Sequence, residues 1–432
     1  MKKFIVVLIG LLVCSLLIVG CSTATTTVTS TTANTVTTTT TATSPASQTP
    51  TLAPKDKILV GMSRPLSGSN QSVGDSAFKP IYDDLVAKWN KDGGIYISQY
   101  SKKLPIELKI YDDKSDIPTM TKQLEQLIVQ DKVDFIWAPC STADIFAAAP
   151  IANKYQKVLV TMEGGATSLR DMLPSLPYVF VSLSFSDWYE MPVLADILAA
   201  KGAKTAYVVY IADLHGIEYS GVAGIELPKK GISIVASKSL PVEMNDFSLI
   251  IKDAKASGAD AFLAFTYPFH VLPITGQMIE LGYNPKAVLF GPGGNFGFYH
   301  TTYKDAVQGV MCWASWNRKI SPALNAMADE LYTGLPEDVQ DWWGQDLYYG
   351  AMEFWKQAVE KAGTLDNTKV QQVMATSHFQ TVLGDTYFTN GLMAKESHPG
   401  EVGQWQNGIV EVVGGNQVTA PLIYPKPAWP SK

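Results

Sequence analysis

The sequence is poor in cysteine and shows no excess of basic residues. Four cysteines occur in 432 residues, too few for a disulfide-bonded scaffold. The formal net charge is −6 and no basic stripe occurs, which argues against a nucleic-acid partner. After the first 20 residues, no apolar run approaches the length of a membrane-spanning helix. These absences predict a soluble, well-packed body that does not bind nucleic acid.

The one long apolar run lies at the N-terminus. It follows Lys2 and Lys3, extends from Phe4 to Gly20 and ends at Cys21, a length at the short limit for a spanning helix. The sequence Leu17-Ile18-Val19-Gly20-Cys21 resembles the lipobox of bacterial lipoproteins, where the signal peptide is cut before the cysteine and the cysteine is lipidated. We therefore expect a signal peptide over 1–20 and a lipidated Cys21; an uncleaved membrane anchor is the alternative. In both cases the body lies outside the cytoplasm and is held at the membrane.

A threonine-rich tract follows the cysteine. Residues 22–54 include no charged residue, and about half of them are threonine. A tract of this composition lacks the apolar side chains needed to form a core. We expect residues 21–54 to form a disordered linker whose ends lie about 30 Å apart.

The body, from residue 55 to 432, alternates between strand and helix patterns. Short apolar strands are expected at 58–62, 106–111, 135–138 and 158–162, with helices of 3.6-residue periodicity between them. The pattern repeats with strands at 178–183, 206–210, 232–236, 261–265 and 288–290 and with helices near 191–200, 247–256 and 271–281. This βαβα order predicts an α/β fold of two Rossmann-like lobes with parallel-rich sheets. Cys140 and Cys312 lie far apart in this order, and we expect two buried thiols rather than one disulfide.

Several segments of the body resemble type I periplasmic solute-binding proteins, in particular the branched-chain amino acid and amide-binding proteins of ABC importers. They follow the order of that family along nearly the whole body. The segments are ILVGMSRPLSG (58–68), NKDGGI (90–95), IELKIYDD (106–113), APCST (138–142), DFSLIIKDAKASGAD (246–260), LFGPGG (289–294), AVEKAGTLD (358–366) and GEVGQWQNGIVEVV (400–413).

The resemblance implies two lobes that are joined by three crossovers and close around a ligand. We place the crossovers near 182–186, 314–319 and 384–387, so that lobe 1 comprises 55–183 and 319–385 and lobe 2 comprises 184–318 and 386–432. It also implies a monomeric binding protein that delivers a small-molecule ligand to an ABC transporter permease, anchored by lipid to the outer face of the cell membrane. A ligand sensor for a signalling partner is the alternative, and an esterase is a remote one.

Ser141 and Thr142 follow a predicted strand and begin a predicted helix. The exposed N–H groups and the positive end of a helix favour a carboxylate there, and the two hydroxyls add donors. In the family, the matching positions hold the carboxylate of the ligand. Ordinary capping of the helix is the alternative role.

Glu163, Gly164 and Gly165 match the second ligand-binding loop of the family. In the family, backbone groups of this loop meet the α-carboxylate and the ammonium of the ligand, and glycine allows a close backbone approach. Glu163 is either an acceptor for an ammonium or amide N–H or a solvated loop acid.

The main departure from the family is Gly293. Many amino-acid binders have an acid after the Gly-Pro turn that pairs with the ammonium, whereas this chain has GPGG at 291–294. A buried ammonium without a partner is costly. Either Glu163 supplies the charge, or the ligand is not an α-amino acid and is larger, flatter or less cationic.

Aromatic residues are frequent near the expected cleft. By resemblance, His215 and Tyr267 occupy positions where rings line the pocket. Trp313, Trp316, Trp342 and Trp343 are each more readily explained as core residues. Asp346 and Tyr349 share a helix with Trp342 at a spacing that points them inward.

Signals for catalysis and cofactors are weak. Gly74-Asp75-Ser76 resembles the nucleophile block of one esterase group, but no Asp-x-x-His follows near the end of the chain. No Gly-x-Ser-x-Gly elbow or phosphate-binding Gly-Lys-Ser/Thr loop occurs, and the five histidines are scattered without metal-ligand spacing. We therefore predict a non-enzymatic protein without a cofactor or metal.

Overall fold

The computed structural model describes residues 54–162, 167–183 and 186–430. The signal peptide, Cys21 and the threonine-rich tract lie outside these residues, as do Glu163, Gly164 and Gly165. Within the described part, none of the helices combines the length and the apolar character needed to cross a bilayer.

The first lobe is built on two small sheets whose longer strands are parallel. One has the order β4-β1-β5, from β1 (Ile58–Arg64), β4 (Ile106–Asp112) and β5 (Phe135–Ile136). The other has the order β15-β16-β7-β6, from β6 (Leu159–Thr161), β7 (Val179–Val181), β15 (Phe388–Thr389) and β16 (Leu392–Met393). β1 begins at the predicted residue and runs two residues further than expected, whereas the strand predicted over 135–138 is only two residues long.

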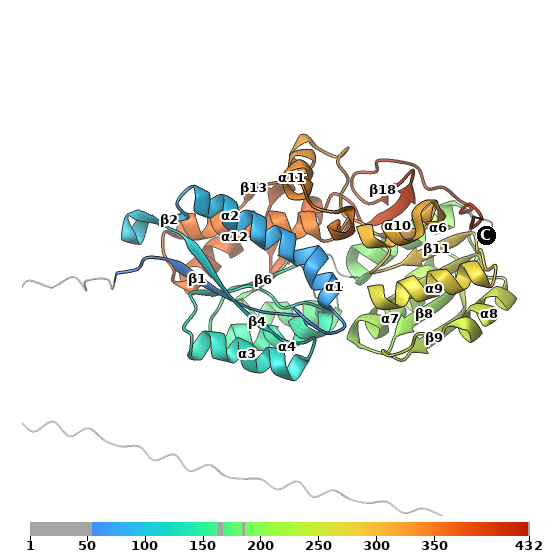
Figure 1. Cartoon of the computed structure of the whole chain (residues 1–432), viewed down its shortest axis with the longest axis horizontal. Helices are drawn as coiled ribbons and strands as arrows, with labels where there is room; N and C mark the ends of the chain where they lie inside the picture. Colours follow the sequence, from blue (N-terminus) through green and yellow to red (C-terminus); the bar gives the residue numbers. More distant parts are fainter. Residues whose placement is uncertain (1–53, 163–166, 184–185, 431–432) are drawn as a thin grey trace, which may run out of the picture. The chain divides into compact units, whose positions relative to one another are not determined.

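Helices on both faces of these strands complete the first lobe. They are α2 (Lys79–Lys91), α3 (Ile117–Val129), α4 (Thr142–Lys154), α5 (Thr167–Met172), α11 (Pro322–Tyr332), α12 (Gln345–Ala362) and α13 (Asn367–Thr376). α12 lies beside α2 and β6, far from both in sequence (Figure 1). Trp355 of α12 contributes to this packing, because its ring lies 6.3 Å from that of Trp89 on α2 and edge-on to Phe135 at 5.2 Å and Trp137 at 5.4 Å.

The second lobe is built on one seven-stranded sheet of order β18-β17-β12-β11-β10-β8-β9. The strands β8 (Thr205–Ile211), β9 (Ser233–Leu240), β10 (Ala261–Phe265), β11 (Ala287–Phe290) and β12 (Met311–Trp313) are parallel. β17 (Val402–Gln406) and β18 (Ile409–Gly414) add an antiparallel edge. The helices of this lobe are α6 (Met191–Ala200), α7 (Leu214–Lys229), α8 (Ser248–Ser257), α9 (Pro268–Glu280) and α10 (Gly297–Tyr303).

The chain passes between the lobes after β7, after β12 and between β16 and β17. The third passage corrects the crossover predicted near 384–387. β15 and β16 form a hairpin, and Leu392 of β16 pairs in parallel with Val181 of β7. Residues 388–393 therefore extend a sheet of the first lobe, because the edge of β7 offers backbone partners to this short hairpin.

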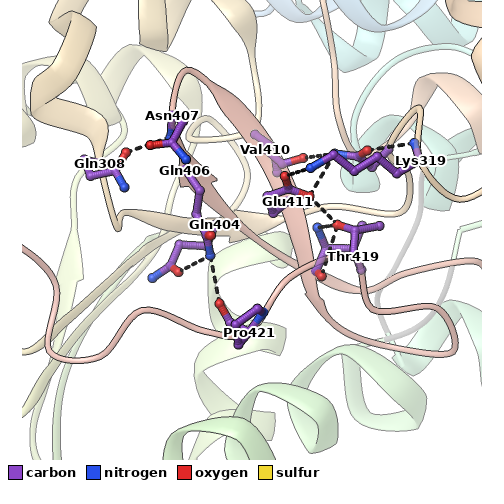
Figure 2. A network of polar contacts seen from close by, with 11 residues as sticks. Gln308, Lys319, Gln404, Gln406, Asn407, Val410, Glu411, Thr419 and Pro421 are labelled. Atoms are coloured by element: carbon purple, nitrogen blue, oxygen red, sulfur yellow. Dashed lines mark hydrogen bonds and ion pairs between the residues drawn. The ribbon is translucent and has the colours of Figure 1, made fainter.

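The C-terminal segment is fastened to β17 and β18 by side chains (Figure 2). Glu411 on β18 lies between the second passage and this segment: it forms an ion pair with Lys319, and Thr419 Oγ1 donates to its Oε2 at 2.6 Å. Further along the tail, Gln406 Nε2 donates to the carbonyl oxygen of Pro421 at 3.0 Å. One passage and the tail thus share an anchor on β18.

Candidate ligand-binding cavity

A cavity lies between the two lobes at the carboxyl ends of their parallel strands. The space between the atoms of its walls is about 530 Å³, a figure that includes space open to solvent. The first lobe contributes Asn70, Val73, Cys140, Ser141, Thr142, Met162 and Leu183. The second lobe contributes His215, Tyr219, Tyr267, Pro292 and Phe296, and the segment before α12 contributes Asp341 and Trp343. This is where ligands collect in open α/β sheets.

Ser141 is the N-cap of α4. Its φ is 84°, its hydroxyl accepts from the N–H of Asp144 at 3.2 Å, and it donates to Asp144 Oδ2 at 2.7 Å. The single proton of this hydroxyl is therefore already committed to Asp144. Burial raises the pKa of Asp144 to about 7, although the Ser141 hydrogen bond opposes the shift. Thr142 follows as the first helical residue, and it is buried at 5% exposure.

His215 and Tyr267 form part of an aromatic wall. Their rings stack at 5.2 Å with an interplanar angle of 24°, and Tyr219 lies 4.4 Å from His215 on the other side. The Nε2 of His215 lies 3.4 Å from the carbonyl oxygen of Gly291. Burial lowers the pKa of His215, so the ring is neutral near pH 7. The wall therefore offers flat, uncharged surface.

α7 was not predicted from the sequence, although it holds both His215 and Tyr219. Gly216, Gly221, Gly224 and Pro228 give this segment a low helix propensity. Packing overrides that propensity, because α7 buries Tyr219, Val222, Ala223 and Leu227. Gly216 is required by the close approach of β8, since a Cβ there would lie 2.0 Å from the carbonyl oxygen of Ile211.

Gly293 does not line the cavity, but its neighbour Pro292 does. Its φ is 127°, and a Cβ at this position would lie 2.5 Å from Val271 Cγ2 and 3.1 Å from the Cα of Pro268. Both contacts are with α9, which packs directly over the turn. An acid of the kind found in amino-acid binders therefore has no room here.

Of the four tryptophans near the cleft, only Trp343 lines the cavity. Trp313 and Trp316 are fully buried and Trp342 is 5% exposed, as core packing predicts. Asp346 and Tyr349 are buried, in agreement with the predicted inward orientation, but neither lines the cavity. Asp346 faces Ser315, and Tyr349 faces Lys88 and Glu330. Ser76, from the esterase-like block, is 5% exposed and also does not line the cavity.

Asp341 is the acid in the cavity wall that the sequence patterns did not reveal. Its Oδ1 accepts from Asn295 Nδ2 at 2.6 Å and from the N–H of Trp343 at 2.9 Å, and its Oδ2 accepts from the N–H of Gly344 at 3.1 Å. Burial raises its pKa to about 6, so it is mainly ionised at neutral pH. No local pattern marks it, because the N-cap of α12 is Gly344 and Asp341 precedes that residue by three positions.

Outside the cavity wall, Glu218 of α7 joins the second lobe to the first. It accepts from Thr167 Oγ1 at 2.6 Å and from Ser168 Oγ at 2.8 Å. Both hydroxyls belong to the first turn of α5. Each is a hydrogen bond to a charged group, the stronger kind.

The comparisons with known proteins agree with this arrangement of two lobes around a cavity. A family model described as periplasmic binding protein matches residues 57–408. The chain therefore belongs to the periplasmic binding protein family. Leu/Ile/Val-binding protein homolog 6 of Brucella abortus (strain 2308) is 27% identical over 212 residues, which are 49% of this chain and 51% of that relative. The chain thus spans about half the length of the curated relatives it matches first.

Solved structures share the fold. The leucine-binding protein LivK of Thermotoga maritima MSB8 has a TM-score of 0.68 at 18% identity, covering 82% of this chain and 97% of that one. A solute-binding protein of an ABC transporter from R. palustris, in complex with 4-hydroxybenzoate, has a TM-score of 0.69 at 19% identity, with coverage of 86% and 98%. These likenesses establish the two-lobe α/β architecture.

We expect Asp346 to make stability fall as pH rises. Its Oδ1 and the carbonyl oxygen of Trp343 both contact the Ser315 hydroxyl, which has one proton for two acceptors. Protonated Asp346 resolves this conflict, and burial raises its pKa to about 8. Because the unfolded side chain ionises near pH 4, the native state binds the extra proton between about pH 4 and 8, and stability decreases over that range.

Denaturant unfolding as a function of pH tests this expectation. The unfolding free energy of Asp346→Asn should fall less between pH 5 and 8 than that of the unaltered protein, by roughly 2–4 kcal/mol. Asp116, the exposed N-cap of α3, provides the control, because hydrogen bonds from Thr119 hold its pKa below the usual value and Asp116→Asn should leave the slope between pH 5 and 8 unchanged. Equal slopes for all three proteins would contradict a protonated Asp346.

Gly293→Ala should destabilise the protein by roughly 2–4 kcal/mol, because it combines a positive φ with a clash against α9. Gly202 has a φ of 83°, and a Cβ added there would meet no atom within 4 Å, so Gly202→Ala isolates the backbone cost. We expect that cost to be about 1–2 kcal/mol. Urea unfolding compares the two variants, and equal losses would show that α9 does not exclude a side chain at Gly293.

Proposed function

We propose that this chain is an extracytoplasmic solute-binding lipoprotein that captures a small carboxylate between its lobes and delivers it to an ABC importer. The observation that carries the proposal is the cavity lined from both lobes, with the N-terminus of α4 in its wall. A ligand that contacts both lobes stabilises their closed arrangement by its differential affinity for that state. The permease then recognises the closed form.

The start of α4 supports a carboxylate as the group that is bound. The N–H groups of Thr142 and Ala143 belong to the first turn, where a helix has no internal acceptor for them. The positive end of the helix dipole favours an anion at the same place. Thr142 lines the cavity, so its hydroxyl adds a side-chain donor.

The body of the ligand is aromatic in this proposal. His215, Tyr219, Tyr267, Phe296 and Trp343 all line the cavity, and rings of this kind pack well on a flat ligand. Gly293 supplies no charge for an ammonium. The R. palustris relative of the same fold was solved with 4-hydroxybenzoate, a ring carboxylate.

Replacing Thr142 tests the carboxylate site. In a calorimetric titration with benzoate and 4-hydroxybenzoate, Thr142→Val should bind both acids about 5- to 30-fold more weakly, since a hydrogen bond to a charged group contributes roughly 1–2 kcal/mol. Ser141→Ala is the matched control. Its hydroxyl proton is directed to Asp144, so it should lose about 1 kcal/mol of stability as a helix cap but less affinity.

The carboxylate site would be refuted by folded Thr142→Val that binds both acids as tightly as the unaltered protein. A thermal-shift screen of amino acids, amides, and aromatic and short organic acids accompanies the titration. The carboxylate site would also be excluded if the tightest ligand were an amide or amine that has no carboxylate.

The lipid anchor is tested separately. We expect the mature protein purified from membranes to begin at Cys21 and to carry lipid, because the run ending at Gly20-Cys21 resembles a lipobox. Cys21→Ser should abolish the lipid and leave the chain either uncleaved or released. Mass spectrometry of the N-terminus decides between these outcomes, and an unmodified chain that still begins at Met1 would show that no lipoprotein processing occurs.

A further inference from the structure

Asp341 is a buried acid of the cavity wall whose carboxylate accepts three hydrogen bonds. It lies between the short helical turn Glu337–Val339 and α12, and it is 1% exposed. Its three donors come from both lobes: Asn295 follows β11 of the second lobe, while Trp343 and Gly344 lead into α12 of the first. The carboxylate therefore keeps one position and orientation.

The same three hydrogen bonds leave acceptor capacity on one oxygen. A carboxylate has about four acceptor positions, two on each oxygen. Oδ1 of Asp341 uses two, for Asn295 and Trp343, whereas Oδ2 uses one, for Gly344. One position on Oδ2 is left for a further donor. Because the acceptor is buried, a ligand donor at this position removes the free-energy cost of leaving it unsatisfied.

The described cavity wall supplies no cation to this acid. Its lining residues there include neither lysine nor arginine, and its histidine, His215, is neutral and already lies against a carbonyl oxygen. A ligand donor is thus the natural partner for Oδ2. An ammonium carries three N–H donors, and the one remaining position on Oδ2 would pair a single donor and leave the other two without an acceptor there. A phenolic hydroxyl carries one donor, which matches that position.

We propose that Asp341 determines specificity by accepting a hydrogen bond from a phenolic hydroxyl on the ligand, so that the chain selects hydroxylated aromatic carboxylates over unsubstituted ones. This assignment rests on the proposed function, since it presumes a carboxylate ligand in the same cavity. The aromatic wall holds the ring, the start of α4 holds the carboxylate, and Asp341 reads the hydroxyl. Selection arises because a ligand without the hydroxyl leaves a buried carboxylate oxygen under-satisfied.

The test is a calorimetric comparison of 4-hydroxybenzoate, benzoate and 4-methoxybenzoate on the full chain. The methoxy compound keeps the oxygen but has no proton to donate. We expect the unaltered protein to bind 4-hydroxybenzoate at least tenfold more tightly than either of the others. Absence of this preference overturns the proposal even if no variant can be folded.

Asp341→Asn supplies the second arm, with Asp366→Asn as the control. Asp366 caps α13 by accepting from the N–H of Thr368 at 2.9 Å and is exposed, so it reports the effect of losing a capping carboxylate alone. Asp341→Asn should reduce the preference for 4-hydroxybenzoate over benzoate to threefold or less, and this ratio of affinities, measured in one variant, is the readout because the loss of a wall residue weakens both acids alike. An unchanged preference in folded Asp341→Asn overturns the assignment.

Leucine in the same titrations separates this proposal from the broader one. If leucine binds tightly and the aromatic acids do not, the chain is still a carboxylate-binding protein, but the phenol assignment is overturned. If none of the four compounds binds the folded protein, the carboxylate site itself is refuted and the assignment falls with it.

Discussion

The cleft depends on a buried hydrogen-bonded junction where the chain returns to the first lobe. Asp341 connects Asn295 of the second lobe to the first amides before α12, and Gln345 continues the connection by donating to the carbonyl oxygen of Ser76 at 2.6 Å. The indole N–H of Trp316 donates to the carbonyl oxygen of Asp341 at 2.9 Å. Because these polar groups are buried, leaving one of them unpaired destabilises the fold by more than its hydrogen bond stabilises it. The junction therefore holds cavity walls from two lobes in one arrangement.

The α/β class and most elements of the body could be predicted from the sequence, because their signals are local. The strand over Ala261–Phe265 and the helix over Met191–Ala200 appear with the predicted bounds. Their apolar periodicity and their boundary residues agree, so tertiary packing only reinforces a local preference. The burial of Trp313 and Trp316 could be predicted from the size and apolar character of their side chains alone.

Other features could not be predicted because they depend on contacts between distant segments. α7 forms despite three glycines and a proline, since its apolar face is buried against β8. The hairpin of β15 and β16 joins β7 across more than 200 residues of sequence, which no local pattern reveals. Asp341 reaches the cavity only because α12 packs on the first lobe, so its position was invisible in sequence order. By contrast, the helix start at Thr142 appears where the strand-to-helix pattern put it.

Glu218 connects the two lobes through groups outside the cavity, and this has a consequence for the timescale of ligand exchange. In the proposed function, an opening of the cleft breaks the hydrogen bonds of Glu218 to Thr167 and Ser168 before solute leaves. Bonds broken during opening raise the barrier to release, and differences in affinity between related complexes arise mostly from release rates. On that proposal, the dwell time of a solute is governed in part by three side chains that are absent from the cavity wall.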